Sequence, residues 1–198
     1  MARSYTMHGV KGAADRAVSL ARAHLTSAVE GSLVHDVQDD PRFQHRGVDL
    51  LWERPGQAVA GVEVKGDRNG RRGNYFLELV SNLEKNTPGC FLYSEADLLL
   101  YVFLDRRELH LLPLGVAREW FLANAAEFPL RSTRTRLGTA AYTTVGAVVP
   151  VRRLLSSVPD AKRYQAGEGG PAELMPAVRP RRAATPPGAG GRRPPGPR

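Results

Sequence analysis

The sequence is poor in cysteine and has no long apolar segment. Cys90 is the only cysteine in 198 residues, which excludes an internal disulfide and a zinc site built from several thiolates. The longest apolar run, near Ala96–Leu104, is interrupted by Asp97 and is too short to cross a bilayer. The N-terminus lacks the charged-then-apolar layout of a secretion signal. We therefore expect a cytoplasmic protein that is not embedded in a membrane.

Acidic residues are also scarce relative to basic ones. The chain has 20 Asp and Glu against 28 Lys and Arg, which gives a net charge of +8 and a pI of about 10.1. Such a charge favours an anionic partner, most simply nucleic acid. Arginine-rich chains also arise from codon composition, so the charge alone is only weak support for that partner.

Composition divides the chain into two parts. Residues 166–198 hold eight of the fifteen prolines and seven of the twenty glycines, with six arginines and two glutamates. Such a segment buries too little apolar surface to offset the entropy of ordering it, so we predict a disordered basic tail. The tail either holds DNA loosely through phosphate contacts or only keeps the protein soluble. Residues 1–165 are long enough for one folded domain.

Hydrophobic periodicity within residues 1–165 predicts helices and strands in mixed order. The predicted helices are Ala13–Glu30 and Val116–Phe128, and the predicted strands are Val48–Trp52, Ala58–Lys65, Tyr75–Ser81, Ala96–Asp105, Leu109–Leu114 and Val145–Val151. The first three strands are expected to form an antiparallel meander, and His35–His45 is expected to be a loop. This order is typical of an α/β or α+β domain with a central mixed sheet.

Three charged side chains interrupt predicted strands that otherwise have the apolar composition of a buried core. Asp49 lies in the first predicted strand, and Glu63 and Lys65 lie in the second. Residues two apart share one face of a strand, about 6.5 Å from each other, and antiparallel pairing would bring Asp49 near Glu63. Two carboxylates and a carbonyl suit a hard cation such as Mg²⁺. The ordinary alternative is an exposed strand face with a solubilising ion pair.

This pattern resembles the PD-(D/E)XK nuclease core of restriction endonucleases and Holliday junction resolvases. Asp49 is followed after thirteen residues by Glu63-Val64-Lys65, with the acidic and basic residues set in an apolar strand. The position before the aspartate holds Val48 in place of proline. The resemblance covers about Ala13–Asp105.

The resemblance implies a restriction endonuclease-like fold, in which helices flank a mixed central β-sheet. It further implies Mg²⁺-dependent cleavage of DNA phosphodiester bonds, endo- or exonucleolytic, with Mn²⁺ as a substitute metal. Asp49, Glu63 and the Val64 carbonyl would bind the metal, and Lys65 would position the attacking water. Members of this superfamily often act as dimers, so a homodimer is compatible with it.

Two further carboxylates are candidates for the same site. Glu30 ends the first predicted helix, a position from which family members often supply an acidic residue, although it is also simply the last exposed residue before Gly31. Glu78 lies in the third predicted strand. It would either join the site or lie on a solvated face of the sheet, and its alternation with Phe76 and Val80 favours the solvated face.

Residues after the second and third strands are candidates for contact with nucleic acid. Arg68, Arg71 and Arg72 form either a basic loop over the DNA backbone or a solvated turn. Ser81 and Asn82 could hydrogen-bond a phosphate. A basic DNA-binding or scaffold protein that keeps the nuclease fold without cutting is the alternative to an enzyme, and an RNA target is not excluded.

Overall fold

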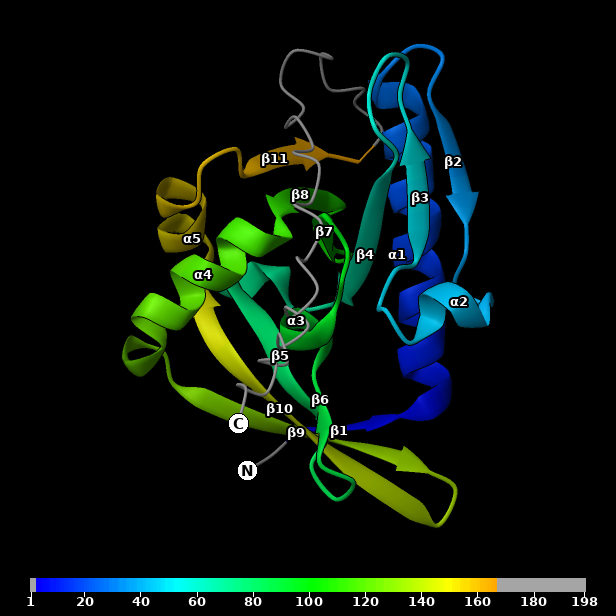
Figure 1. Cartoon of the computed structure of the whole chain (residues 1–198). Coiled ribbons are helices and arrows are strands. Elements are labelled where there is room, and N and C mark those ends of the chain that lie inside the picture. Colours follow the sequence, from blue (N-terminus) through cyan, green and yellow to red (C-terminus); the bar gives the residue numbers. More distant parts are fainter. Residues whose placement is uncertain (1–2, 167–198) are drawn as a thin grey trace, which may run out of the picture.

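The computed structural model describes residues 3–166. The predicted tail lies outside the described residues from position 167 onward. Helices and strands follow one another along the chain as labelled in Figure 1. Their bounds are β1 Arg3–Thr6, α1 Met7–Ala28, β2 Leu33–Asp36, α2 Pro41–Gln44, β3 Leu50–Glu53, β4 Ala60–Asp67, the 3₁₀ turn η1 Gly70–Arg72, β5 Asn74–Asn82, β6 Thr87–Pro88, α3 Cys90–Tyr93, β7 Leu98–Phe103, β8 Glu108–Pro113, α4 Leu114–Asn124, the 3₁₀ turn η2 Ala125–Glu127, β9 Leu130–Leu137, β10 Ala140–Pro150, α5 Val151–Ser157 and β11 Lys162–Gln165.

The strands form two mixed sheets. Sheet A has the order β1-β9-β10-β5-β6, and sheet B has the order β11-β8-β7-β4-β3-β2. The pairs β1–β9 and β4–β7 are parallel, and the remaining neighbours are antiparallel. The coarse prediction of an α/β architecture with a mixed sheet flanked by helices is therefore confirmed.

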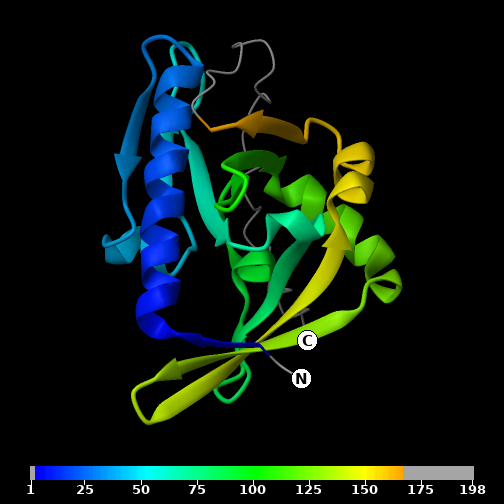
Figure 2. The ribbon, with the colours of Figure 1, turned by 180° about the vertical axis from the view of Figure 1, so that it is seen from behind.

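Helix α1 covers one face of sheet B, as Figure 2 shows from behind. Its buried positions include Ala17, Ala21 and Leu25, which pack with alternate residues of β3, β4, β7 and β8. The approach is close at Gly66 of β4, where a Cβ atom would lie 2.9 Å from the Ala17 Cβ and 3.0 Å from the Ala13 carbonyl oxygen. Within residues 3–166, no helix has the length and apolar character that a membrane span requires.

The opposite face of sheet B packs against sheet A and helix α4 in a second core. Leu99, Tyr101 and Phe103 of β7 contribute to it from sheet B. Leu77 of β5 and Ala147 of β10 contribute from sheet A, with other residues of both strands. We call this second core the inner core, and the sheet faces that bound it the inner faces.

The expected three-strand meander is wrong. β3 and β4 do pair antiparallel, but β4 pairs next with β7, and β5 pairs with β10 and β6 in the other sheet. Between β4 and β5 the chain passes through η1 and leaves it at Gly73, whose positive φ of 67° favours glycine. This connection carries the chain from sheet B into sheet A.

The expected loop over His35–His45 contains regular structure instead. It begins with the last residues of β2, which pairs with β3, and also contains the short helix α2. The Asp40 side chain accepts a hydrogen bond from the Arg42 N–H at the start of α2, and Pro41 occupies the first helical position. The predicted strand Val145–Val151 is the second half of β10, which ends at Pro150.

Candidate active site

Asp49 lies where the pairing between β3 and β4 stops. Its backbone N–H donates to the Val62 carbonyl over 2.9 Å, and its side-chain Oδ2 accepts from the Val64 N–H over 2.8 Å. The carboxylate therefore accepts the hydrogen bond that a backbone carbonyl of β3 would otherwise accept from β4. Since the N–H and C=O of one strand residue point to the same side, the Val64 carbonyl also faces the Asp49 side of the strand.

Glu63 and Lys65 lie on the inner face of β4. In the register with β7 they are opposite Leu99 and Tyr101, both of which belong to the inner core. Glu63 is only 8% exposed. The strand alternation thus turns the carboxylate and the ammonium toward the interior between the two sheets, whereas the sequence pattern predicted only that they share one face of a strand.

Burial and charge repulsion raise the pKa values of the two carboxylates. Burial, followed by the charge of Asp49, raises the pKa of Glu63 to about 8, although Lys65 acts in the opposite direction. Burial also raises the pKa of Asp49, while the hydrogen bond from the Val64 N–H lowers it. Each carboxylate disfavours the charge of the other, so the pair holds a proton near neutral pH unless a cation compensates it.

Lys65 is bound to Glu78 of β5. The Lys65 Nζ lies 2.6 Å from the Glu78 Oε2, and the two side chains are 28% and 15% exposed. Burial by itself would lower the pKa of Lys65, but the Glu78 carboxylate more than offsets it, so the pKa is raised and the ammonium stays charged. This ion pair joins sheet B to sheet A at the site.

The favoured solvated position of Glu78 is therefore wrong. In the pairing of β5 with β10, Glu78 is opposite Gly146 and Val80 is opposite Val145, so Leu79 is an extra residue in a β-bulge. Leu77 and Glu78 precede the bulge and pair in regular register with Ala147 and Gly146, so they lie on opposite faces of β5. Leu77 packs in the inner core, and Lys65 of sheet B reaches Glu78, a contact between the two sheets that the sequence alone does not predict.

Helix α3 adds two residues that the sequence analysis did not assign to the site. Cys90 hydrogen-bonds Glu63, and burial raises the pKa of its thiol well above the usual value, which makes it a poor nucleophile. Tyr93 is 40% exposed. Burial of its hydroxyl, followed by the charge of Glu63, raises the pKa of Tyr93 to about 12. The charge of Glu63 therefore acts on both side chains.

Gly47 allows α3 to pack against the segment that leads to Asp49. Its φ is +58°, and a Cβ atom there would lie 3.0 Å from both the Tyr93 Cε2 and the Ser94 Cβ. The Ser94 hydroxyl also donates to the Gly47 carbonyl over 2.6 Å. A signal for this contact is missing from the sequence, because 46 and 47 positions separate the partners.

Glu30 does not join this group. It is exposed and lies two residues beyond the end of α1, next to Gly31, which packs against Pro55 in the β3–β4 turn. That turn is at the far end of β3 from Asp49, about 20 Å away at the usual rise per strand residue. Glu30 is thus an exposed residue of the connection between α1 and β2, away from Asp49.

The residues predicted to contact nucleic acid lie at two other places. Arg68, Arg71 and Arg72 are exposed on the loop between β4 and β5, where Asp105 accepts from the backbone N–H groups of Gly70 and Arg71. At the end of β5, the Asn82 side chain accepts from the Lys85 N–H over 2.9 Å, and the Ser81 hydroxyl donates to the Thr87 carbonyl over 3.4 Å. Ser81 and Asn82 therefore stabilise their own turn.

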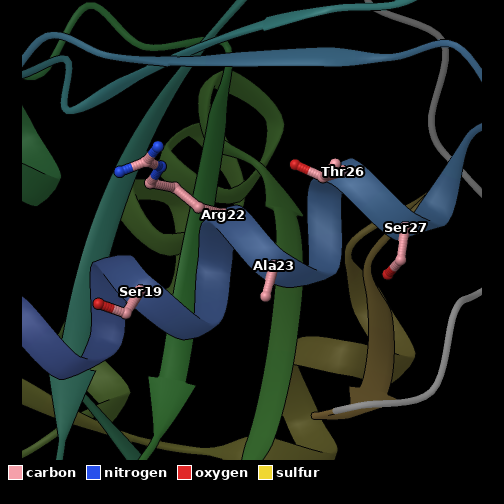
Figure 3. A pocket seen from close by; sticks show the side chains of 5 residues that line it. All are labelled: Ser19, Arg22, Ala23, Thr26 and Ser27. Atoms are coloured by element: carbon pink, nitrogen blue, oxygen red, sulfur yellow. The ribbon is translucent and has the colours of Figure 1, made fainter.

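A shallow hollow on α1 is a separate feature. Figure 3 shows that it is lined by Ser19, Arg22, Ala23, Thr26 and Ser27, all from this one helix. Helix α1 covers the face of sheet B opposite to that of Glu63 and Lys65. The hollow contains no carboxylate, so it is not part of the candidate site.

The possible ligands for a cation at the site are two carboxylates and one carbonyl. Within residues 3–166, no three His, Cys, Asp or Glu side chains are grouped as ligands of a single metal ion. Asp49 and Glu63 supply two carboxylate oxygen donors, and the Val64 carbonyl, which faces the Asp49 side of β4, is a neutral one. This is an oxygen-only set, which matches the preference of Mg²⁺ and Mn²⁺.

Comparison with known proteins adds no assignment. No protein-family model matches the chain, and no curated protein and no solved structure is significantly similar to it. The arrangement of Asp49, Glu63, Lys65 and Glu78 is therefore the basis on which a function can be argued.

Proposed function

We propose that the protein is a metal-dependent nuclease that hydrolyses DNA phosphodiester bonds through a PD-(D/E)XK-like site on a restriction endonuclease-like fold. The observation that carries the proposal is the meeting of Asp49 and Glu63 beside Lys65, with the Asp49 carboxylate bound to the Val64 N–H. Two carboxylates whose pKa values are both raised are costly for the fold, and perturbed groups of this kind concentrate at functional sites.

The donor set fits a divalent cation. Asp49 and Glu63 repel each other in a buried setting, and a cation held by both would remove that repulsion. Mg²⁺, or Mn²⁺ in its place, supplies a Lewis acid that polarises a phosphoryl oxygen and lowers the pKa of a bound water. Val64 would contribute its carbonyl as the third protein oxygen.

The remaining side chains position the reacting groups. The Val64 N–H orients the Asp49 carboxylate, and Glu78 holds the Lys65 ammonium in its charged form on the inner face of β4. A fixed ammonium beside the scissile phosphate stabilises negative charge in the transition state and orients the attacking water. Tyr93 is partly exposed, and the charge of Glu63 acts on its hydroxyl.

Incubation with plasmid DNA tests the proposal. The wild-type protein is expected to nick or linearise plasmid in Mg²⁺ or Mn²⁺ and to be inactive in EDTA. Glu63→Gln and Lys65→Ala should each lower the rate by about a hundredfold or more. Glu119→Gln, which changes an exposed carboxylate on α4, is the matched control and should cut like the wild type.

A protein that binds DNA without cutting it is the second candidate. The 2.6 Å ion pair between Lys65 and Glu78 favours it, because the ammonium is already engaged by a carboxylate. DNA binding with no cleavage in either Mg²⁺ or Mn²⁺ would establish this candidate and refute the nuclease. Parallel reactions with an RNA duplex would reveal an RNA substrate.

A further inference from the structure

The face of sheet A that meets Lys65 is the one opposite to its inner face. In the pairing of β5 with β10, Glu78 is opposite Gly146, and in the pairing of β10 with β9, Gly146 is opposite Arg131. Residues directly opposite each other point to the same side of a sheet, so Glu78 and Arg131 share a face. The next residue of β10, Ala147, packs in the inner core on the other face. We call the face of Glu78 and Arg131 the site face.

The edge of β5 allows Lys65 to reach the site face. Strand β6 pairs with β5 at Val80 and Asn82, near its end. Earlier in β5 the edge is turned toward sheet B, where the Phe76 N–H donates to the Tyr101 hydroxyl over 3.0 Å. Lys65 is opposite Tyr101 in the pairing of β4 with β7. An anion bound at Lys65 therefore lies beside the edge of β5, and a longer polyanion can continue from there over the site face.

Phe76 places an aromatic ring on the site face. It precedes Glu78 by two residues, so the two side chains share a face, and it is partly exposed. Within residues 3–166, the side chains that form the two cores do not include Phe76. Its ring lies over Gly146, where a Cβ atom would be only 2.6 Å from the Phe76 Cζ. The ring therefore occupies the place of a side chain between Glu78 and Arg131.

Arg131 supplies a positive charge on the other side of this ring. It is exposed and lies two strands away from Glu78, about 10 Å at the usual spacing of strands. One of its N–H groups, at Nη1, donates to the Leu130 carbonyl over 2.9 Å. In the described part of the chain, no salt bridge joins Arg131 to a carboxylate. A guanidinium group has five N–H donors, so Arg131 can bind an external anion.

We infer that Phe76 and Arg131 bind an unpaired DNA strand next to the cleavage site, the ring by stacking on a base and the guanidinium group by binding a backbone phosphate. Proteins that bind single strands combine cations along the backbone with aromatic rings on which bases stack, and the site face offers both beside Lys65. In a duplex the bases are already stacked on one another, so such a ring selects an unpaired strand. This inference rests on the proposed function and narrows its substrate to DNA that is single-stranded at the cut.

Binding of fluorescein-labelled oligonucleotides, measured by anisotropy in EDTA over a range of salt concentrations, tests the inference. The wild type should bind a single strand more tightly than the duplex of the same sequence. Phe76→Leu should weaken single-strand binding about fivefold or more because stacking is lost, whereas Phe76→Tyr keeps the ring and should bind like the wild type. Arg131→Ala should also weaken binding and should reduce the slope of log K against log salt by about 0.7.

Arg134→Ala is the matched control. It removes the same side chain from the opposite face of the same strand, so its affinity and salt slope should equal those of the wild type. Circular dichroism spectra show whether each variant is folded. If Phe76→Leu does not fold, the comparison of Arg131→Ala with Arg134→Ala and that of single strand with duplex decide the inference.

The outcomes separate this binding surface from the nuclease. Negative supercoiling favours local strand opening, so plasmid remains a substrate for an enzyme of this specificity. If the wild type cuts plasmid but binds the duplex at least as tightly as the single strand, or if folded Phe76→Leu and Arg131→Ala bind like the wild type, the inference is refuted and the proposed function stands. An equal loss in Arg134→Ala would also refute it, since the effect would then be one of total charge. If the wild type neither binds nor cuts DNA, or if it prefers an RNA strand, the proposed function and the inference both fall.

Discussion

Glu63 should make the stability of the metal-free protein depend on pH in an unusual direction. Its pKa is raised from 4.5 to about 8 by burial and by Asp49. Between these values the unfolded chain has lost the proton and the folded chain keeps it, so the free energy of unfolding falls as pH rises. One proton corresponds to about 1.4 kcal/mol per pH unit. Between pH 5 and pH 7.5 the wild type should therefore lose about 3 kcal/mol that Glu63→Gln does not lose.

Urea unfolding in EDTA at several pH values measures this difference. Histidines and other groups outside the carboxylate pair titrate alike in the wild type and in Glu63→Gln, so the difference between the two curves reports on residue 63 and its interaction with Asp49. Glu119→Gln, with its exposed carboxylate on α4, should follow the wild type. Parallel curves for the wild type and Glu63→Gln would show that residue 63 is ionised at neutral pH and would refute the argument for a strained carboxylate pair.

Three further predictions concern the same group. Mg²⁺ at ten times its dissociation constant should stabilise the wild type by about 1.4 kcal/mol in thermal or urea unfolding, but not Asp49→Asn or Glu63→Gln, and equal shifts in all three would place the cation elsewhere. Lys65→Ala should lower the free energy of unfolding by about 2 kcal/mol, because it leaves Glu78 buried without its partner. The double variant Lys65→Ala/Glu78→Gln should lose less stability than Lys65→Ala alone. Additive losses in a double-mutant cycle would show that the two side chains are not coupled. Gly47→Ala should lower the free energy of unfolding by about 2 kcal/mol, because residue 47 has a positive φ and contacts α3. An unchanged melting temperature, measured by circular dichroism, would contradict that packing.

The sequence predicts best the elements whose side chains have a clear apolar pattern. The continuous apolar runs over β7 and β8 and the helical spacing of α1 and α4 come from burial itself, so the predicted segments overlap the observed ones. β9 and β11 carry arginine, threonine and lysine in place of an apolar face, and they are held as strands by their neighbours. The meander failed because the expectation that successive strands pair does not hold for β4 and β5.

The candidate site was predictable where it depended on local geometry. Glu63 and Lys65 share a face because of strand alternation, and Asp49 reaches them because β3 and β4 form a hairpin. Glu78 and Tyr93 could not be placed in this way. One depends on an ion pair between two different sheets, and the other on a helix that packs against Gly47 from a distant part of the chain.

The hydrogen bond that the Asp49 carboxylate accepts from the Val64 N–H gives the two acidic residues unequal diagnostic value. An acceptor at position 49 completes the edge of a strand, so a homologue without the proposed nuclease activity would still gain from keeping aspartate or asparagine there. The backbone hydrogen bonds of β4 do not involve the carboxylate at position 63, which weakens the fold at neutral pH. If the proposal is right, retention of the glutamate in a set of homologues is therefore the better marker of that activity.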